Sequence, residues 1–144
     1  MGRAGTKPLF CRLDKNDYEF VDSWIDKLGL SKLANQTFRT LSGGERQKAL
    51  IARAMAQEPE ILMLDEPGKN LDFNAKRQLI NFLDDLYEQN PLTILMVSHQ
   101  MEMFCKNCER SLLMNKGRIL ADGQPKNILK TEAFQGLYNM ENIE

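Results

Sequence analysis

The sequence predicts an α/β fold in which a helical piece precedes half of a parallel-sheet layer. Two continuous apolar runs, 61–64 and 93–97, suit strands of a parallel sheet that is covered on both faces. An amphipathic stretch, 74–89, lies between them and predicts the helix that must connect two parallel strands. The residues before about position 57 carry helical patterns and loops but no convincing strand.

Helix-capping and helix-breaking residues predict the elements of the N-terminal part. Residues 1–13 predict a loop, and Asp14 predicts the cap of a helix that ends at Gly29. The apolar residues of this helix recur at helical spacing: Val21, Trp24, Ile25 and Leu28. Residues 31–35 predict one more helical turn, and 37–41 predict an extended or loop segment.

A second helix is predicted from Gly44 to about Gln57, because Pro59 stops it. Its predicted apolar stripe contains Ala49, Leu50, Ala52, Ala54 and Met55.

The sequence of the C-terminal part predicts short helices, a loop and a hairpin. Residues 67–72 predict a loop and residues 100–108 a helix. The stretches 111–114 and 118–121, joined across Asn115-Lys116-Gly117, predict a hairpin, and short helices are expected near 125–129 and 132–138. The predicted organisation is a helical subdomain over 1–40 and part of an α/β core over 41–144.

Composition excludes several classes of function. A chain of 144 residues with 42% hydrophobic residues suits one ordinary domain. The net charge of −1 gives no basic footprint for nucleic acid, and no apolar run approaches the ~20 residues of a membrane helix. Three cysteines, an odd number, favour reduced thiols in a cytosolic protein. Cys105 and Cys108 are expected to lie one helical turn apart without a redox or metal role.

Ser42-Gly43-Gly44 opens a predicted helix. A helix N-terminus exposes unpaired N–H groups and the positive end of the helix dipole, so anions bind there. Two glycines let a phosphate approach the backbone, and the serine adds a hydroxyl donor. An ordinary Ser-Gly-Gly turn is the alternative reading of these residues alone.

Asp65 and Glu66 end the first predicted strand. A buried strand delivers them to the carboxyl edge of the sheet, where α/β proteins bind ligands. Asp65 there is suited to hold Mg²⁺, mainly through water, and Glu66 to polarise an attacking water. The alternative is a strand followed by a solvated acidic turn, which the adjacent Pro67 makes less favourable.

In this order and spacing, the two blocks resemble the signature and Walker B motifs of ABC-type ATPases. Glu45 and Gln47 continue the signature helix, and Asn70-Leu71-Asp72 resembles the D-loop of the family. The loop departs from the family pattern at Gly68, where Thr is usual, and at Lys69.

His99 is the single histidine and follows the second predicted strand in Met96-Val97-Ser98-His99. It resembles the switch histidine that contacts the γ-phosphate in ABC ATPases, although Gln100 replaces the usual Asp. A structural histidine at a strand end is the alternative. Residues 112–123 resemble the C-terminal hairpin of the family.

Both ends of the chain are similar to ATPases that serve importers of iron-siderophores, haem and cobalamin. The similarity at the front covers Gly2-Arg3, Pro8, Arg12-Leu13 and Asp17, and at the back 131–138. The phosphate loop G-x-x-x-x-G-K-[ST] occurs nowhere in the 144 residues, and 2–7 are rejected as one because the order is Gly-Thr-Lys and no strand precedes it. The resemblance therefore implies a partial P-loop NTPase fold, the C-terminal half.

The resemblance implies an ATP-hydrolysing importer subunit with ATP and Mg²⁺ as ligands. Glu66 and His99 would be catalytic, and Asp65 would hold the metal. The nucleotide would be contacted by Ser42, Gly43, Gly44, Glu45, Gln47 and Asp72. A second ATPase subunit, head to tail, and transmembrane permease subunits would be the partners, at the cytoplasmic face of the membrane, with no nucleic acid. Without a phosphate loop the chain is expected to be inactive alone.

Two other functions remain open at this point. One is a soluble ABC ATPase in DNA repair, chromosome maintenance or translation, which the absence of sustained heptads and of a basic face counts against. The other is a truncated product that is inert or acts as a binding decoy.

Overall fold

The computed structural model describes residues 13–138. Cys11, most of the N-terminal similarity and all but the last residue of the loop expected over residues 1–13 lie outside this range. Two compact units are distinguished, Met1–Met103 and Phe104–Glu144, and each is described by itself. The boundary predicted between 40 and 41 stays a prediction.

Helix α1, Lys15–Lys27, is capped as the sequence predicts. The Asp17 N–H donates to Asp14 Oδ1 at 3.0 Å, and the Asp14 N–H donates to Asp17 Oδ2 at 2.9 Å, so two orphan donors are satisfied. Gly29, with φ +68°, ends the helix. Trp24 is buried and Lys27 lies over its ring.

Two short 3₁₀ turns follow, η2 over Ser31–Leu33 and η3 over Phe38–Thr40. The first confirms the predicted extra turn. The second differs from the extended or loop segment predicted there, because Thr40 N–H and Thr40 Oγ1 both donate to the Thr37 carbonyl and close the turn.

Helix α2, Gly43–Met55, buries Ile51, Ala52 and Met55. The predicted stripe was wrong in including Leu50, which is 47% exposed, and in omitting Ile51. At about 100° per residue, Leu50 points well away from the face that Ile51, Ala52 and Met55 share.

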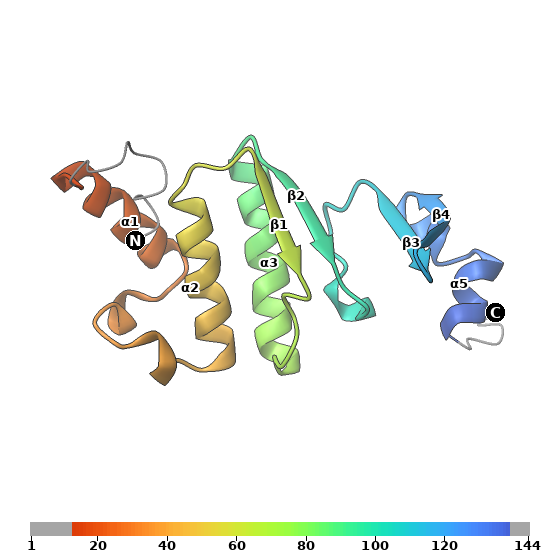
Figure 1. Ribbon diagram of the computed structural model, residues 1–144, viewed down its shortest axis with the longest axis horizontal. Coiled ribbons are helices and arrows are strands. Elements are labelled where there is room, and N and C mark those ends of the chain that lie inside the picture. Colours follow the sequence, from red (N-terminus) through yellow and green to blue (C-terminus); the bar gives the residue numbers. More distant parts are fainter. Residues whose placement is uncertain (1–12, 139–144) are drawn as a thin grey trace. The chain divides into compact units, whose positions relative to one another are not determined.

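Strands β1, Ile61–Asp65, and β2, Thr93–Val97, are parallel, with Ile61 opposite Thr93 and Asp65 opposite Val97. Helix α3, Phe73–Gln89, connects them (Figure 1). The predicted strand–helix–strand unit is therefore confirmed. A helix is needed here because two parallel strands cannot be joined by a tight turn.

The sheet is covered on one face in the described part of the chain. Leu62 and Leu64 are buried, and the connecting helix contributes the buried residues Leu79, Leu83 and Leu86. The opposite face exposes Ile61 and Met63, together with Leu95 and Val97 of the neighbouring strand. The described elements supply a helix on one side only, so the cover that the apolar strands predict for the other face does not come from these residues.

The helix predicted over 100–108 is also wrong. Only η4, Met101–Met103, forms, and a separate turn follows in which the Cys108 N–H donates to the Cys105 carbonyl. Phe104, Asn107 and both cysteines have modest helix propensity, so nothing local extends the turn. Cys105 and Cys108 lie at the two ends of this turn rather than on a helix.

The second unit is built on the predicted hairpin. Strands β3, Ser111–Asn115, and β4, Arg118–Gly123, pair antiparallel. Lys116 and Gly117 both have positive φ, as a hairpin turn of the primed type requires. Arg110 forms two hydrogen bonds to the Asp122 carboxylate, at 2.8 and 2.7 Å.

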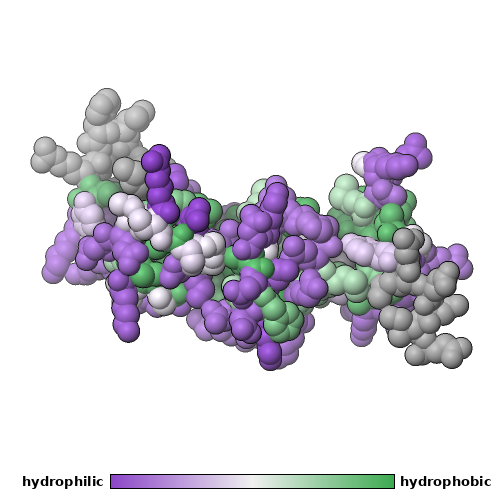
Figure 2. Space-filling view, turned by 90° about the horizontal axis from the view of Figure 1, so that it is seen from below, coloured by the Kyte–Doolittle hydropathy of each residue, from purple (hydrophilic) through white to green (hydrophobic). Residues whose placement is uncertain are grey.

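Two short helices complete this unit, α4 over Pro125–Ile128 and α5 over Glu132–Tyr138, as predicted. Phe134 and Tyr138 stack with ring centroids 4.6 Å apart. Figure 2 shows hydrophilic residues over much of the surface in that view, interrupted by hydrophobic patches. No helix among residues 13–138 has the length and apolar character needed to cross a bilayer.

Candidate functional site

Glu66 and His99 meet beyond the carboxyl ends of the two parallel strands. The Glu66 N–H donates to the Val97 carbonyl at 2.9 Å, which extends the pairing of β1 and β2 by one step. Glu66 Oε1 and His99 Nδ1 lie 2.6 Å apart, although the residues are separated by 33 positions in sequence. The fold therefore places these two predicted catalytic residues in direct contact.

Glu66 presents one engaged and one unengaged oxygen. Its side chain is 27% exposed, whereas that of His99 is 70% exposed. The second oxygen, Oε2, is buried and has no hydrogen-bond partner among the described residues. Because an unsatisfied buried acceptor is costly, this oxygen is suited to accept a hydrogen bond from a water or ligand. Glu66 also has φ +46°, a strained backbone for a residue with a side chain, and such strain is concentrated at functional sites.

Asp65 ends β1 and is exposed. No group of three or more metal-ligating side chains occurs within the part of the chain that the structure describes. This arrangement still fits Mg²⁺, which is commonly bound by one or two carboxylates together with water and substrate phosphates. Asp65 is the residue here that would hold the ion.

The N-terminus of α2 is organised by a second capping box. The Ser42 N–H donates to Glu45 Oε2 at 2.7 Å, and Ser42 Oγ accepts from the Glu45 N–H at 3.4 Å. The hydrogen bond from the Ser42 backbone, and then that involving its hydroxyl, lower the pKa of Glu45. Gly43 and Gly44 follow as the first helical residues, whose N–H groups have no acceptor within the helix.

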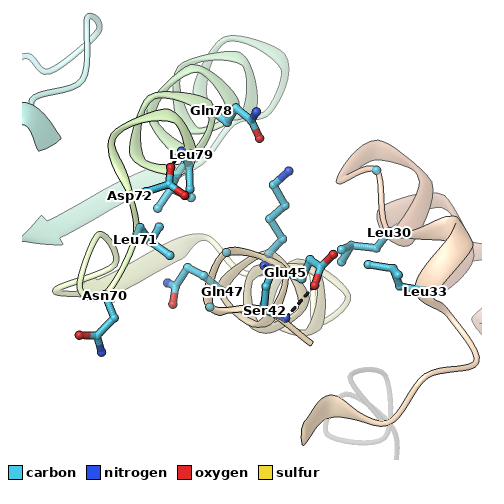
Figure 3. A pocket seen from close by; sticks show the side chains of 15 residues that line it. Leu30, Leu33, Ser42, Glu45, Gln47, Asn70, Leu71, Asp72, Gln78 and Leu79 are labelled. Carbon is cyan, nitrogen blue, oxygen red and sulfur yellow. Dashed lines mark hydrogen bonds between the residues drawn. The ribbon is translucent and has the colours of Figure 1, made fainter. Parts of the chain in front are cut away.

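A groove of about 340 Å³ runs along this helix start (Figure 3). Its lining combines the predicted nucleotide contacts with the loop before α3: Ser42, Gly43, Gly44, Glu45, Gln47, Asn70, Leu71 and Asp72. Asp72 also caps α3, since its Oδ1 accepts from the Ala75 N–H at 2.8 Å. All six predicted nucleotide contacts therefore share one groove.

The glycines allow the loop and the helix to approach. A Cβ on Gly43 would lie 3.4 Å from the Asn70 carbonyl oxygen, and one on Gly44 would lie 3.6 Å from the Ala75 Cβ. Close backbone approach at Gly43 thus joins the start of α2 to the loop containing Asp72.

The groove and the Glu66–His99 contact are distinct. None of Asp65, Glu66 and His99 lines the groove. The predicted residues thus form two sets rather than one site.

Sequence reasoning missed Lys48 and Gln78, which also line the groove. Lys48 lies four residues after Gly44 on the same helix, and this i, i+4 spacing could have indicated it. Gln78 belongs to no motif and gave no signal.

The chain is similar to known proteins in both sequence and structure. The ABC transporter family profile matches residues 6–69. The ferric enterobactin transport ATP-binding protein FepC of Escherichia coli is 36% identical over 96% of this chain and 51% of its own length. The petrobactin import ATP-binding protein FpuC of Bacillus anthracis is 34% identical over 97% of this chain and 52% of its own length.

A solved metal-chelate type ABC transporter in an inward-facing conformation matches with a TM-score of 0.87 and 34% identity, over 96% of this chain and 56% of the other. The chain spans about half the length of the relatives it matches. It therefore has a partial ABC ATPase fold and belongs to the ATP-binding subunits of ABC transporters, of which it matches the C-terminal portion.

Proposed function

We propose that this chain is the C-terminal portion of the nucleotide-binding subunit of an ABC importer, and that it contributes to ATP hydrolysis. The observation that carries the proposal is the 2.6 Å contact between Glu66 and His99 at the carboxyl edge of the parallel sheet. The names of FepC and FpuC, which mention ferric enterobactin and petrobactin, support an iron-siderophore as the transported substrate. Haem, cobalamin or a related metal compound are the alternatives that the sequence resemblance implies.

Glu66 acts as the general base in this proposal. Its buried Oε2 has no partner among the described residues and accepts the hydrogen bond, and then the proton, of the attacking water. His99 holds the other oxygen through Nδ1, which fixes the direction of the carboxylate. The exposed ring of His99 is also available to contact the γ-phosphate. Mg²⁺, held by Asp65, neutralises phosphate charge when it is bound.

The groove at the start of α2 serves a different role. Its backbone N–H groups and the helix dipole suit the phosphates of an ATP held by a second subunit in a head-to-tail dimer. Gly43 and Gly44 keep the approach open, and Asp72 lies across the groove. We assign the contact with permease subunits to residues 1–40, which places the protein at the cytoplasmic face of the membrane.

Hydrolysis requires a phosphate loop, and none occurs in the 144 residues. We therefore expect the chain alone to be inactive, and the test uses this chain preceded by the phosphate-loop half of FepC. Phosphate release should fall ~10²–10⁴-fold in Glu66→Gln, because the amide cannot take the proton. His99→Ala should also slow phosphate release. Asp65→Asn should weaken the dependence of phosphate release on Mg²⁺.

Glu60→Gln is the matched control, because Glu60 is an exposed carboxylate just before the other end of β1. Its rate should equal that of the parent. Release by Glu66→Gln at the parent rate would refute the catalytic assignment.

A further inference from the structure

Gly68 has no room for a side chain. A Cβ at this position would lie 2.5 Å from Met103 Sδ, 3.0 Å from Met103 Cγ and 3.1 Å from Gln100 Oε1. Carbon atoms in favourable contact are about 3.5–4.0 Å apart, so even one methyl group collides. The backbone is not the reason for glycine here, because Gly68 is not among the glycines with positive φ. The absence of a side chain is therefore required by packing against Met103.

Met103 cannot move aside easily. Its side chain is 1% exposed and is among the largest fully buried ones. Methionine is flexible, but a buried methionine surrounded by close-packed neighbours has no solvent to turn into. Because Met103 is buried, added volume at Gly68 presses on the two backbone segments as well as on the flexible end of the Met103 side chain.

These two segments carry Glu66 and His99. Gly68 lies two residues after Glu66, in a tight loop where the Lys69 N–H donates to the Glu66 carbonyl at 3.0 Å. Met103 lies four residues after His99, in η4, where the Met103 N–H donates to the Gln100 carbonyl at 3.1 Å. Each site residue is therefore joined to its side of the Gly68–Met103 contact by a short hydrogen-bonded turn.

We propose that Gly68 and Met103 are positioning residues whose close contact sets the distance between Glu66 and His99. The proposal rests on the proposed function for the importance of that distance. The buried Met103 side chain packs against the loop after β1 and limits how closely this loop can approach η4. Gln100 Oε1 is buried beside Gly68, so a side chain at position 68 would crowd this atom as well as Met103.

The single histidine gives a direct measurement in the 144-residue chain. With histidine labelled with ¹³C only at ring Cε1, the NMR spectrum contains one ring signal to follow. Glu66→Gln provides the reference position for an altered Glu66–His99 contact. Gly68→Ala should move the His99 signal away from the parent position toward that reference, and Gly68→Ala combined with Met103→Ala should return it toward the parent.

Gly136→Ala is the matched control. A Cβ there meets nothing within 4 Å and Gly136 is exposed, so the His99 signal should not move. No movement in Gly68→Ala, or a combined variant that stays displaced, would overturn the proposal.

If Gly68→Ala fails to fold, the variant that combines Gly68→Ala with Met103→Ala tests the proposal. Recovery of folding with a parent-like His99 signal supports the contact, and continued failure refutes it. Hydrolysis is not measured here, so failure of this proposal is distinct from failure of the catalytic role of Glu66.

Discussion

Glu45 shows how one carboxylate can serve the start of a helix. Its contact with Ser42 lowers its pKa, which means that the folded protein favours the charged form. Such a group contributes stability above its unfolded pKa, and the contribution is lost as pH falls through the lowered folded value. The helix start should therefore weaken in acid.

We accordingly predict that stability against denaturant falls as pH drops below the ordinary glutamate range, and that Glu45→Gln reduces this dependence. Denaturation midpoints measured from neutral pH into acid test it. Glu60→Gln is the control, an exposed glutamate for which the same comparison should leave the pH dependence unchanged. An identical pH profile for Glu45→Gln and the parent would contradict the role of the capping box.

Single residues also show what the sequence can and cannot predict. Asp14, Gly29 and Ser42 are local signals, and the structure confirms the helix boundaries they indicate. Glu66 and His99 were predicted as site residues from the strand ends and the family resemblance, but their direct contact was not predicted. Nor was the packing of Gly68 on Met103 predicted, because it depends on side-chain volumes from two distant segments.

Among the elements, the strands were predictable in type but not in cover. Apolar runs and an intervening amphipathic helix specify a parallel pair, and β1 and β2 are parallel. Which face is covered depends on neighbouring elements, which the composition of a strand does not reveal. The error over 100–108 has a related cause, since a short segment after a strand lacks the length that helix periodicity needs.

The exposed sheet face leads to a prediction about association. Ile61, Met63, Leu95 and Val97 form an apolar surface on strands that also have open edges. Such surfaces promote self-association, so we expect the 144-residue chain to associate in a concentration-dependent way. Met63→Lys should reduce this association, because Met63 is 71% exposed and tolerates a charge.

Sedimentation velocity at several concentrations measures the effect. Asn74→Lys adds the same charge at an exposed position on α3 and should leave association unchanged. A parent chain that remains a single monomeric species at all concentrations would contradict the prediction.

For the whole molecule, the separation of the two residue sets is the main feature. Glu66 and His99 lie in contact at the sheet edge, whereas neither lines the groove at the start of α2. A protein that places the two sets apart can use them on two nucleotides, which is the arrangement of a head-to-tail dimer. Neither set includes a phosphate loop.

The 144-residue chain should therefore bind Mg-ATP weakly. A phosphate loop supplies backbone N–H groups and a lysine to the phosphates, and a helix start alone replaces only part of that. Calorimetric titration of the chain with Mg-ATP measures the affinity. A dissociation constant in the low micromolar range would show that the residues present here are sufficient, contrary to this expectation.

In the proposed function, Glu66 is the general base for ATP hydrolysis while the Ser42–Gly44 helix start engages the nucleotide of a second subunit. Its most direct test is size-exclusion chromatography of Glu66→Gln in the FepC fusion, with and without Mg-ATP. Loss of the base removes a charge near the γ-phosphate and no binding contact, so ATP should be retained in a stable closed dimer. We predict that the Glu66→Gln fusion forms a dimer only in the presence of Mg-ATP. Adding Gly44→Arg, which fills the groove, should leave this protein monomeric in Mg-ATP. A Glu66→Gln protein that stays monomeric in Mg-ATP would contradict it.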